Sequence, residues 1–371
     1  MLFCKPASTP LTLYVPMKKK MAPDAKVHQN VMKTESDENL KSNAPFRAEI
    51  QWRNVAVNLF IHLGFFVGLY YIITFKLQLK TFIYFFFLTC LCNLGVTIGV
   101  HRLWSHRSFK CTRPIKLLLT FFYTMAGQSS IFHWVQIHRV HHKFSETLKD
   151  PLDVNRGFFF AHVGWYCLSY HPECETEMKR IDMDDIKADK DLMFQYKYYS
   201  HLFTLLNFLS VLIPCYFWGE SFKIAFWVCF VTRFAINFTQ LNFTNSANHF
   251  IGKRPYDKTQ SATDNIACTI FSFGEGYHNY HHVFPYDYRT GEFGDIGHYN
   301  LSAVIIDFWY KMGWVWDRKL VSQDMINRRV LRTGDGSHWL SHDEAHKNSI
   351  YGYGDKDIDE ADQKELERMI G

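Results

Sequence analysis

The chain has 371 residues, of which 47% are hydrophobic and 17% are aromatic, and its formal net charge is +5. This modest charge is spread along the chain and gives no indication of nucleic-acid binding, so we expect no nucleic-acid partner. The nine cysteines are an odd number without CxxC pairs, and several lie inside apolar runs, which argues against the disulfide framework of a secreted protein. The composition indicates a membrane protein with sizeable polar parts.

The two ends of the chain are more polar than the middle. Residues 1–45 contain a basic cluster that follows a weakly apolar stretch, the reverse of a secretory signal, and we expect a disordered tail there. Residues 339–371 are expected to form a polar C-terminal tail. The intervening residues, 46–338, are expected to form one integral-membrane domain.

Four almost uncharged segments lie between these tails, at 55–75, 81–100, 202–218 and 224–243. Each approaches the roughly 20 residues that a spanning helix needs. The joining residues are too few for anything but tight turns, so the sequence predicts two helical hairpins. Because a hairpin returns to the side on which it starts, both tails and the segment 101–201 should share one face of the membrane. We therefore expect an all-α membrane protein with four transmembrane helices in two hairpins and a helical cap.

Basic residues near the spans indicate which face carries the cap. The tail before the first span has nine Lys and Arg, the middle segment 14, and the chain after the fourth span 14. The two hairpin turns together have only Lys76, Lys80 and Lys223. Since cytosolic loops carry the excess of Lys and Arg, the cap and both termini are expected in the cytosol.

Three further features are expected around the spans. Residues 115–125 are apolar but follow Pro114 and are too short to span, which predicts a helix in the membrane interface or inside the cap. Residues 173–197 are charged and predict a solvated helical segment. Four polar residues of the fourth span would be costly in hydrocarbon and should line the bundle interior: Arg233, Asn237, Gln240 and Asn242.

Histidines gather in three clusters beside the apolar segments. They are His101 and His106 in HRLWSH, His138, His141 and His142 in HRVHH, and His278, His281 and His282 in HNYHH. On a helix, residues three or four apart share a face, so each HxxHH cluster directs its rings to one place. The motif NSANH adds His249, with Asn245 one turn before it. Nine imidazoles exceed what one ion can take, so we expect two metal ions in the cap.

The spacing of the histidines restricts the chemistry of this site but does not identify its metal. Imidazole suits iron, copper and zinc alike, while the lack of cysteine ligands argues against structural zinc. Beside membrane spans, a redox-active metal pair suits oxygen activation against an unactivated C–H bond. Hydrolysis by a metal-bound water is the competing class, but it usually needs a carboxylate base. The GEG sequence from Gly274 to Gly276 is interpreted as a turn, because it lacks the strand and helix of a nucleotide fingerprint.

Six motifs carry a resemblance to a known family. They are HRLWSHRSF, HRVHHKFSET, RGFFFAHVGW, NSANHFIGKRPYD, GEGYHNYHHVFP and RVLRTGDGSH. Over about residues 52–338 the chain resembles the animal membrane acyl-CoA desaturases of the stearoyl-CoA desaturase type. The resemblance implies a multi-pass enzyme of the endoplasmic reticulum membrane with two iron ions (Fe2+). It also implies O2, a fatty acyl-CoA substrate and electrons from cytochrome b5 and its reductase, with a cis double bond inserted at a Δ9-like position.

The resemblance also assigns the nine catalytic, metal-binding histidines to two irons. One iron would be bound by His101, His106, His142 and His282, with Asn245 acting through a water. The other would be bound by His138, His141, His249, His278 and His281.

Substrate contacts implied by the resemblance are partly altered in this chain. The expected contacts are Asn54, Gln128, Trp134, Thr89, Asn93, Leu241 and Asn242, of which Asn54 binds the coenzyme A head group in the family. After Trp134 the family has Ala-Arg-Asp, whereas this chain has Val135, Gln136 and Ile137; the family's Arg-Lys pair before His-Pro is here Ser169 and Tyr170. Ser129 replaces an Asn, and LKDPLD at 148–153 replaces DADPHN. Thr89 and Asn93 stand where the family has Tyr and a small residue, and Leu241 and Asn242 replace its Thr-Trp pair. These departures predict altered substrate handling around a complete set of ligands.

Four alternatives compete at this point, and two of them are disfavoured. Front-end desaturases are disfavoured, because the HPGG of their fused cytochrome b5 domain is missing and His278 stands where they have Gln. A fatty acyl hydroxylase would use the same histidines, and so would a desaturase acting on a different acyl carrier. A catalytically inactive lipid-binding paralogue is disfavoured by the nine retained histidines.

Overall fold

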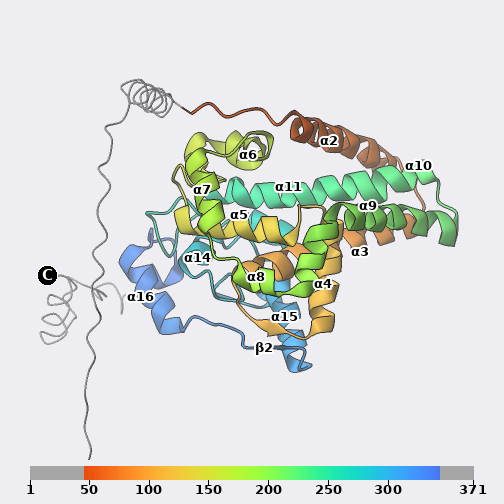
Figure 1. Ribbon diagram of the computed structural model, residues 1–371. Coiled ribbons are helices and arrows are strands. Elements are labelled where there is room, and N and C mark those ends of the chain that lie inside the picture. Colours follow the sequence, from red (N-terminus) through yellow and green to blue (C-terminus); the bar gives the residue numbers. More distant parts are fainter. Residues whose placement is uncertain (1–45, 343–371) are drawn as a thin grey trace, which may run out of the picture. The chain divides into compact units, whose positions relative to one another are not determined.

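Four long apolar helices form the membrane part of the computed structural model, which describes residues 46–342 (Figure 1). They are Trp52–Ile73, Leu79–Ser105, Lys190–Trp218 and Phe222–Phe250. All four predicted spans are therefore present, and each helix begins before the apolar segment that predicted it, although the first ends at Ile73 instead of residue 75. The expected tail at 1–45 and most of the tail at 339–371 lie outside the described residues.

Two of the spans are regular and two change helix type along their length. The two regular spans are the first, α2 (Trp52–Ile73), and the third, α9 (Lys190–Trp218). The second begins as α3 (Leu79–Leu94) and continues as the π-helix η1 (Gly95–Ser105). The fourth runs through α10 (Phe222–Ala225), the π-helix η4 (Phe226–Thr232), α11 (Arg233–Asn245) and α12 (Ala247–Phe250). π-Helical turns are rare and are frequently found at functional sites. η1 carries His101, and His106 follows directly after it.

Close packing explains a glycine at the start of η1. A Cβ on Gly95 would lie 2.4 Å from the backbone nitrogen of Tyr123 in α4 (Arg113–Ala126). Only glycine permits this approach of the two backbones. The short apolar segment 115–125 is thus a helix that packs on the spans α3, η1 and α9.

The two hairpin turns lie against each other. Glu220 follows α9, and its carboxylate accepts hydrogen bonds from the Gln78 backbone nitrogen at 2.9 Å and from the Thr81 hydroxyl at 2.6 Å. Gln78 and Thr81 belong to the other hairpin. Both hairpins therefore turn at the same end of the bundle, and the polar parts of the chain meet at the opposite end, as the hairpin argument predicts (Figure 1).

Polar side chains of the fourth span lie inside the bundle. Arg233, Asn237, Gln240 and Asn242 are all buried, as predicted. The Arg233 guanidinium donates to the carbonyls of Cys229 and Met125, each at 2.9 Å, and to the side chain of Asn207 in α9. Its contacts thus join three helices, α4, α9 and α11, in the membrane interior.

The cap is built from short helices and one small sheet. β1 (Lys110–Cys111) pairs antiparallel with β2 (Val315–Trp316), which ties the chain after the second span to the C-terminal part. The helices and helical turns of the cap are α5 (Ile131–Phe144), η2 (Val154–Arg156), η3 (Phe160–Gly164), α6 (Trp165–Cys167), α7 (Pro172–Arg180), α8 (Asp184–Ala188), α13 (Ile266–Ser272), α14 (His278–Val283), η5 (Ile296–His298), α15 (Leu301–Lys311), α16 (Gln323–Thr333) and η6 (Trp339–His342).

Two cap segments differ from their predictions. The charged segment 173–197 consists of two short helices and the start of α9, and it is not fully solvated because Cys174, Ile186 and Leu192 are buried. Leu340 in η6 is also buried, in a cluster with residues of α14 and α16. Ordered packing thus continues to the last described residues.

Candidate metal centre

The predicted histidine clusters converge in the cap. His101 and His106 lie in and just after η1, His138, His141 and His142 on α5, His249 on α12, and His278, His281 and His282 on α14. All nine belong to one of two groups whose candidate ligand atoms lie within 4.8 Å of one another. The nine histidines thus form two groups, each of which could hold a metal ion.

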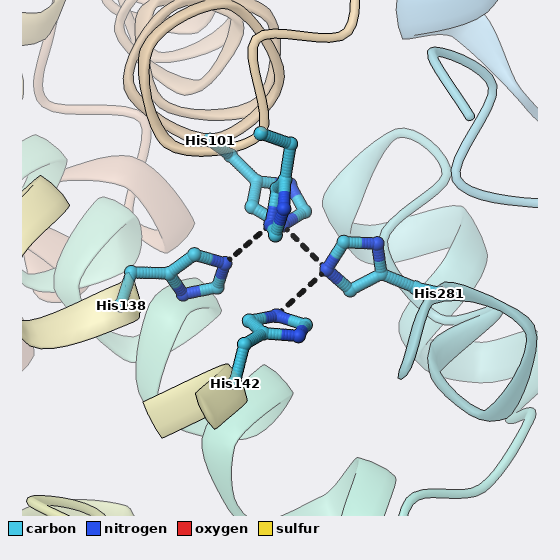
Figure 2. Close-up of side chains that lie close together, drawn as sticks. His101, His138, His142 and His281 are labelled. Carbon is cyan, nitrogen blue, oxygen red and sulfur yellow. Dashed lines mark hydrogen bonds between the residues drawn. The ribbon is translucent and has the colours of Figure 1, made fainter. Parts of the chain in front are cut away.

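The first group is His101, His106, His138, His142 and His281. Figure 2 shows the labelled rings of this group pointing toward a common centre. The Nε2 atoms of His101 and His281 are 2.9 Å apart, those of His106 and His138 are 2.8 Å apart, and those of His142 and His281 are 3.0 Å apart. Rings from three separate elements, η1, α5 and α14, thus present the same ring nitrogen to one point.

The second group is His141, His249, His278 and His282. The Nε2 atom of His278 lies 3.0 Å from that of His249 and 3.0 Å from that of His282. The rings of His142 and His282, one from each group, stack with centroids 4.5 Å apart. The two groups are therefore adjacent.

The division of histidines between the two sites corrects the one implied by the resemblance. His282 lies with His141, His249 and His278, and does not join His101, His106 and His142. His138 and His281 lie with His101 instead of with His141. The reason is helical geometry: His281 and His282 are consecutive on α14, so their rings diverge, and the same holds for His141 and His142 on α5.

Two metal ions fit these groups. With metal–nitrogen distances of about 2.1 Å, ligands at right angles place neighbouring nitrogens about 3.0 Å apart. The observed Nε2 separations of 2.8 to 3.0 Å agree with that spacing. Neutral imidazole is the form that binds metal, and burial lowers the pKa of His106, His138 and His142, with nearby histidines lowering it further. The same direction and leading cause hold for His278, His281 and His282.

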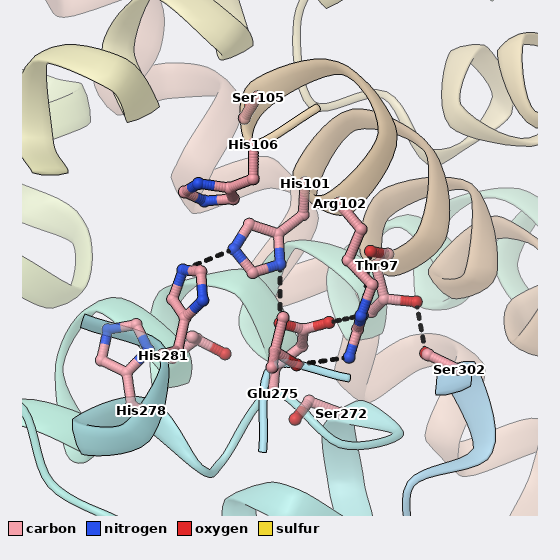
Figure 3. A network of polar contacts seen from close by, with 12 residues as sticks. Thr97, His101, Arg102, Ser105, His106, Ser272, Glu275, His278, His281 and Ser302 are labelled. Carbon is pink, nitrogen blue, oxygen red and sulfur yellow. Dashed lines mark hydrogen bonds and ion pairs between the residues drawn. The ribbon is translucent and has the colours of Figure 1, made fainter. Parts of the chain in front are cut away.

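A carboxylate that the sequence did not single out orients one of these rings. The Nδ1 of His101 lies 2.7 Å from Glu275 Oε2, and Arg102 also donates to this carboxylate (Figure 3). Burial raises the pKa of Glu275, but the Arg102 charge and the hydrogen bonds from His101 and Arg102 outweigh it, and the net pKa is lowered. An ionised Glu275 fixes the tautomer that leaves His101 Nε2 free for metal. The GEG motif, interpreted as a turn, therefore contains a residue of the site.

Two further ligand candidates have partners on their outer nitrogens. His141 Nδ1 lies 2.9 Å from Asp150 Oδ1, and His249 Nδ1 lies 2.8 Å from the Ser261 hydroxyl. Asp150 is the first of the two aspartates in LKDPLD, the loop that departs from the family pattern. Metal-binding histidines commonly donate their second N–H to an acceptor. The sequence therefore predicts that such acceptors exist, but not that they are Glu275 and Asp150.

A cavity adjoins both groups. Its wall includes His101, His138, His141 and His278, and the ring of Trp134 stacks on His138 with centroids 4.7 Å apart. Of the predicted substrate contacts, Trp134, Asn93 and Leu241 line this cavity, and so does Asn245. Thr89, Gln128 and Asn242 are buried but are not part of its lining, and Asn54 donates a hydrogen bond to the Tyr166 carbonyl away from it.

The positions that lack the family's charges are engaged in local contacts. Gln136 donates from Nε2 to the Met178 carbonyl of α7 at 2.8 Å. Ser169 pairs with Glu49: its backbone nitrogen donates to the Glu49 carbonyl, and its hydroxyl accepts from the Glu49 nitrogen, both at 2.9 Å.

Comparison with known proteins agrees with this site. The family model for fatty acid desaturases matches residues 79–318. The chain is 40% identical to an acyl-CoA Delta-12 desaturase of Tribolium castaneum, over 89% of this chain and 95% of the relative. It is 41% identical to an acyl-CoA Delta-9 desaturase of Acheta domesticus, over 87% of each chain. It is 42% identical to the stearoyl-CoA desaturase of Homo sapiens, over 79% of this chain and 80% of the relative.

These relatives differ in the bond that they oxidise, but they share the acyl-CoA desaturase description and cover most of the chain. Four apolar helices and two histidine groups able to hold metal ions accompany the match. The chain therefore belongs to the fatty acid desaturase family, among its acyl-CoA desaturases.

Proposed function

We propose that this protein is an O2-dependent acyl-CoA desaturase that inserts a cis double bond at a Δ9-like position, using two iron ions held by its nine clustered histidines. The observation that carries the proposal is the pair of adjacent groups of five and four imidazoles in a chain that belongs to the acyl-CoA desaturases. When bound, the irons would supply the reduction of O2 and the oxidant that removes two hydrogens from adjacent carbons. Asn245, which lines the cavity and stands one helical turn before His249, would act at the metal centre through a water.

The protein's own residues would position the reaction. Glu275 and Asp150 hold the rings of His101 and His141 with Nε2 directed inward. Trp134 packs on His138 and closes one side of the cavity, so the acyl chain would approach the site between an aromatic ring and α11. Burial of these groups excludes water and keeps the histidines neutral.

The membrane location and orientation that we propose rest on the distribution of basic residues. We place residues 46–338 as the catalytic domain in the endoplasmic reticulum membrane, with the cap and both termini in the cytosol. The support is the low number of basic residues in the two hairpin turns. A cap on that face would be accessible to cytochrome b5 and its reductase as electron donors.

One expression experiment separates the proposal from its rivals. In yeast that lacks its own desaturase, the protein is expected to produce monounsaturated acyl chains, with the double bond located by mass spectrometry. In microsomes, turnover should require NADH or NADPH, cytochrome b5, its reductase and O2. Hydroxylated chains would instead identify an acyl hydroxylase, and no product of either kind would favour the inactive paralogue. Undiminished turnover without O2 would refute oxygen activation.

The missing charges at the head-group positions lead to a second expectation. Phosphates are best bound by cationic groups, and three basic side chains of the family pattern are absent here. We expect the combined variant Gln136→Arg, Ile137→Asp, Ser169→Arg and Tyr170→Lys to lower the KM for acyl-CoA about tenfold at low salt, with a smaller change in kcat. Steady-state kinetics across a range of salt concentrations measure this.

A matched control distinguishes head-group contact from a general charge effect. Met312→Lys with Leu320→Lys adds the same net two positive charges at exposed positions of the C-terminal part. This control should leave the KM unchanged. If the fourfold variant also has an unchanged KM at every salt concentration, these positions do not contact the head group, and their divergence is neutral. If the fourfold variant and the wild type have the same KM for acyl chains on another carrier, a change of carrier is excluded.

A further inference from the structure

Glu146, in the loop that follows α5, has a backbone conformation that its residue type rarely adopts. Its φ is +65°, which lies in the left-handed region. A residue with a side chain is strained there and glycine is not, so the backbone alone would favour glycine at this position. Strain of this kind persists only where the surroundings fix the residue, and it gathers at functional sites. A glutamate at this position therefore points to a role for its side chain.

Three hydrogen bonds hold Glu146 in this conformation. Its backbone nitrogen donates to Asp150 Oδ2 at 3.1 Å, and its carbonyl accepts from the Asn155 side chain at 2.8 Å. Its carboxylate reaches a distant part of the chain, where Oε1 accepts from the backbone nitrogen of Ser261 at 2.6 Å. The first two bonds stay within the loop 145–156, and the third joins this loop to the segment between α12 and α13.

The residue that Glu146 holds contacts a candidate metal ligand. The Ser261 hydroxyl lies 2.8 Å from His249 Nδ1, and His249 Nε2 lies 3.0 Å from His278 Nε2. When Nε2 binds a metal, Nδ1 carries the proton and donates it to the hydroxyl oxygen, which fixes the tautomer and the orientation of the ring. Glu146 itself belongs to neither histidine group, so any effect that it has on a metal passes through other residues.

The same loop orients another member of this group. Asp150 accepts from the Glu146 backbone nitrogen with Oδ2, and its Oδ1 lies 2.9 Å from His141 Nδ1. The loop 145–156 thus holds the outer nitrogens of two ligand candidates of the second group, that of His141 directly and that of His249 through Ser261.

From these contacts we infer that Glu146 is a positioning residue for the second metal site, and that it acts by holding the Ser261 hydroxyl against His249. The inference rests on the two-metal centre of the proposed function and deepens it at one of the two sites. The strained backbone of Glu146 persists because its carboxylate fixes the segment that carries Ser261.

Glu146→Gly separates this role from a purely structural one. Glycine removes the strain together with the carboxylate, so the melting temperature of the metal-free protein should change little. The affinity for one of two Fe2+ ions should nevertheless fall about three- to tenfold, because the Ser261 hydroxyl is no longer held at the ring. Adding Glu275→Gln, which acts on the first group, should weaken the other ion as well. Chelator competition on full-length protein loaded anaerobically with Fe2+ measures the affinities, and scanning calorimetry measures the melting temperature.

Ser261→Ala tests the route from Glu146 to the metal. It removes the acceptor of His249 directly and should weaken the same ion about tenfold. If Glu146 acts through Ser261, the double variant with Glu146→Gly should bind that ion no more weakly than Ser261→Ala alone.

Asp317→Gly is the matched control for Glu146→Gly. Asp317 is also an acidic residue with a positive φ, of 54°, but it is exposed, pairs with Lys110 and belongs to neither histidine group. This variant should keep both Fe2+ affinities.

The outcomes separate the inference from the proposed function. An unchanged Fe2+ affinity in Glu146→Gly, an equal fall for both ions, or an additive loss in the double variant overturns the inference. A selective fall in a protein whose wild type makes no desaturated product in yeast supports the inference and contradicts the proposed function. A wild type that binds fewer than two ions contradicts both.

Discussion

Purified protein is expected to carry about two iron ions per chain, and His138→Ala is expected to abolish activity with the fold retained. His138 belongs to the group of five imidazoles, its Nε2 lies 2.8 Å from that of His106, and its ring is covered by Trp134. Alanine removes a nitrogen from the first site without adding a charge or a bulky group. Elemental analysis, circular dichroism and a desaturation assay measure the three quantities.

The control is a histidine on the same helix. His133 lies on α5 five residues before His138, is exposed, and belongs to neither group. His133→Ala should keep both metal content and turnover. A wild-type content near one ion per chain, or full activity of His138→Ala, would show that the two groups do not act as a two-metal centre.

Glu275→Gln is expected to weaken metal binding at the first site by about 10- to 100-fold, the usual effect of losing a partner that orients a ligand. The glutamine keeps the shape of the side chain but directs an NH2 group at either His101 or Arg102, both of which donate to the carboxylate. Metal affinity measured by chelator competition should fall more than the melting temperature does.

Glu292→Gln is the matched change at a carboxylate unrelated to metal. Glu292 is buried and accepts from His338 at 2.8 Å and from Tyr256 at 2.8 Å, and His338 belongs to neither histidine group. This variant should lose stability and keep its metal affinity. Equal metal affinities for Glu275→Gln and the wild type would assign Glu275 a purely structural role.

The sequence predicted the parts of this site that depend on local spacing. Residues three or four apart on a helix must share a face, so HxxHH identified His138, His141 and His142 before any packing was known. The four spans could also be predicted, because length and lack of charge are enough to identify a candidate spanning helix. The division of the histidines between the two groups could not be predicted, because whether His281 meets His101 or His249 depends on how α14 packs against η1 and α12.

Other residues escaped prediction for different physical reasons. Glu275 sits in a GEG sequence whose glycines suggest a turn, and its role depends on His101, which is 174 residues earlier in the chain. Asn237 and Gln240 were expected inside the bundle and are buried there, but a sequence does not tell which partners their amides find.

The buried Arg233 has a consequence for how the protein is made. A lone arginine at the centre of a spanning helix opposes insertion by about 2.5 to 3.5 kcal/mol, and the acceptors that satisfy it here belong partly to α4 and α9. The third and fourth spans are joined by only Gly219, Glu220 and Ser221. The translocon would therefore release them as one unit, with the Asn207 side chain already placed against the guanidinium. The fourth span is thus a poor autonomous membrane segment, and biogenesis of the enzyme depends on its neighbour in the hairpin.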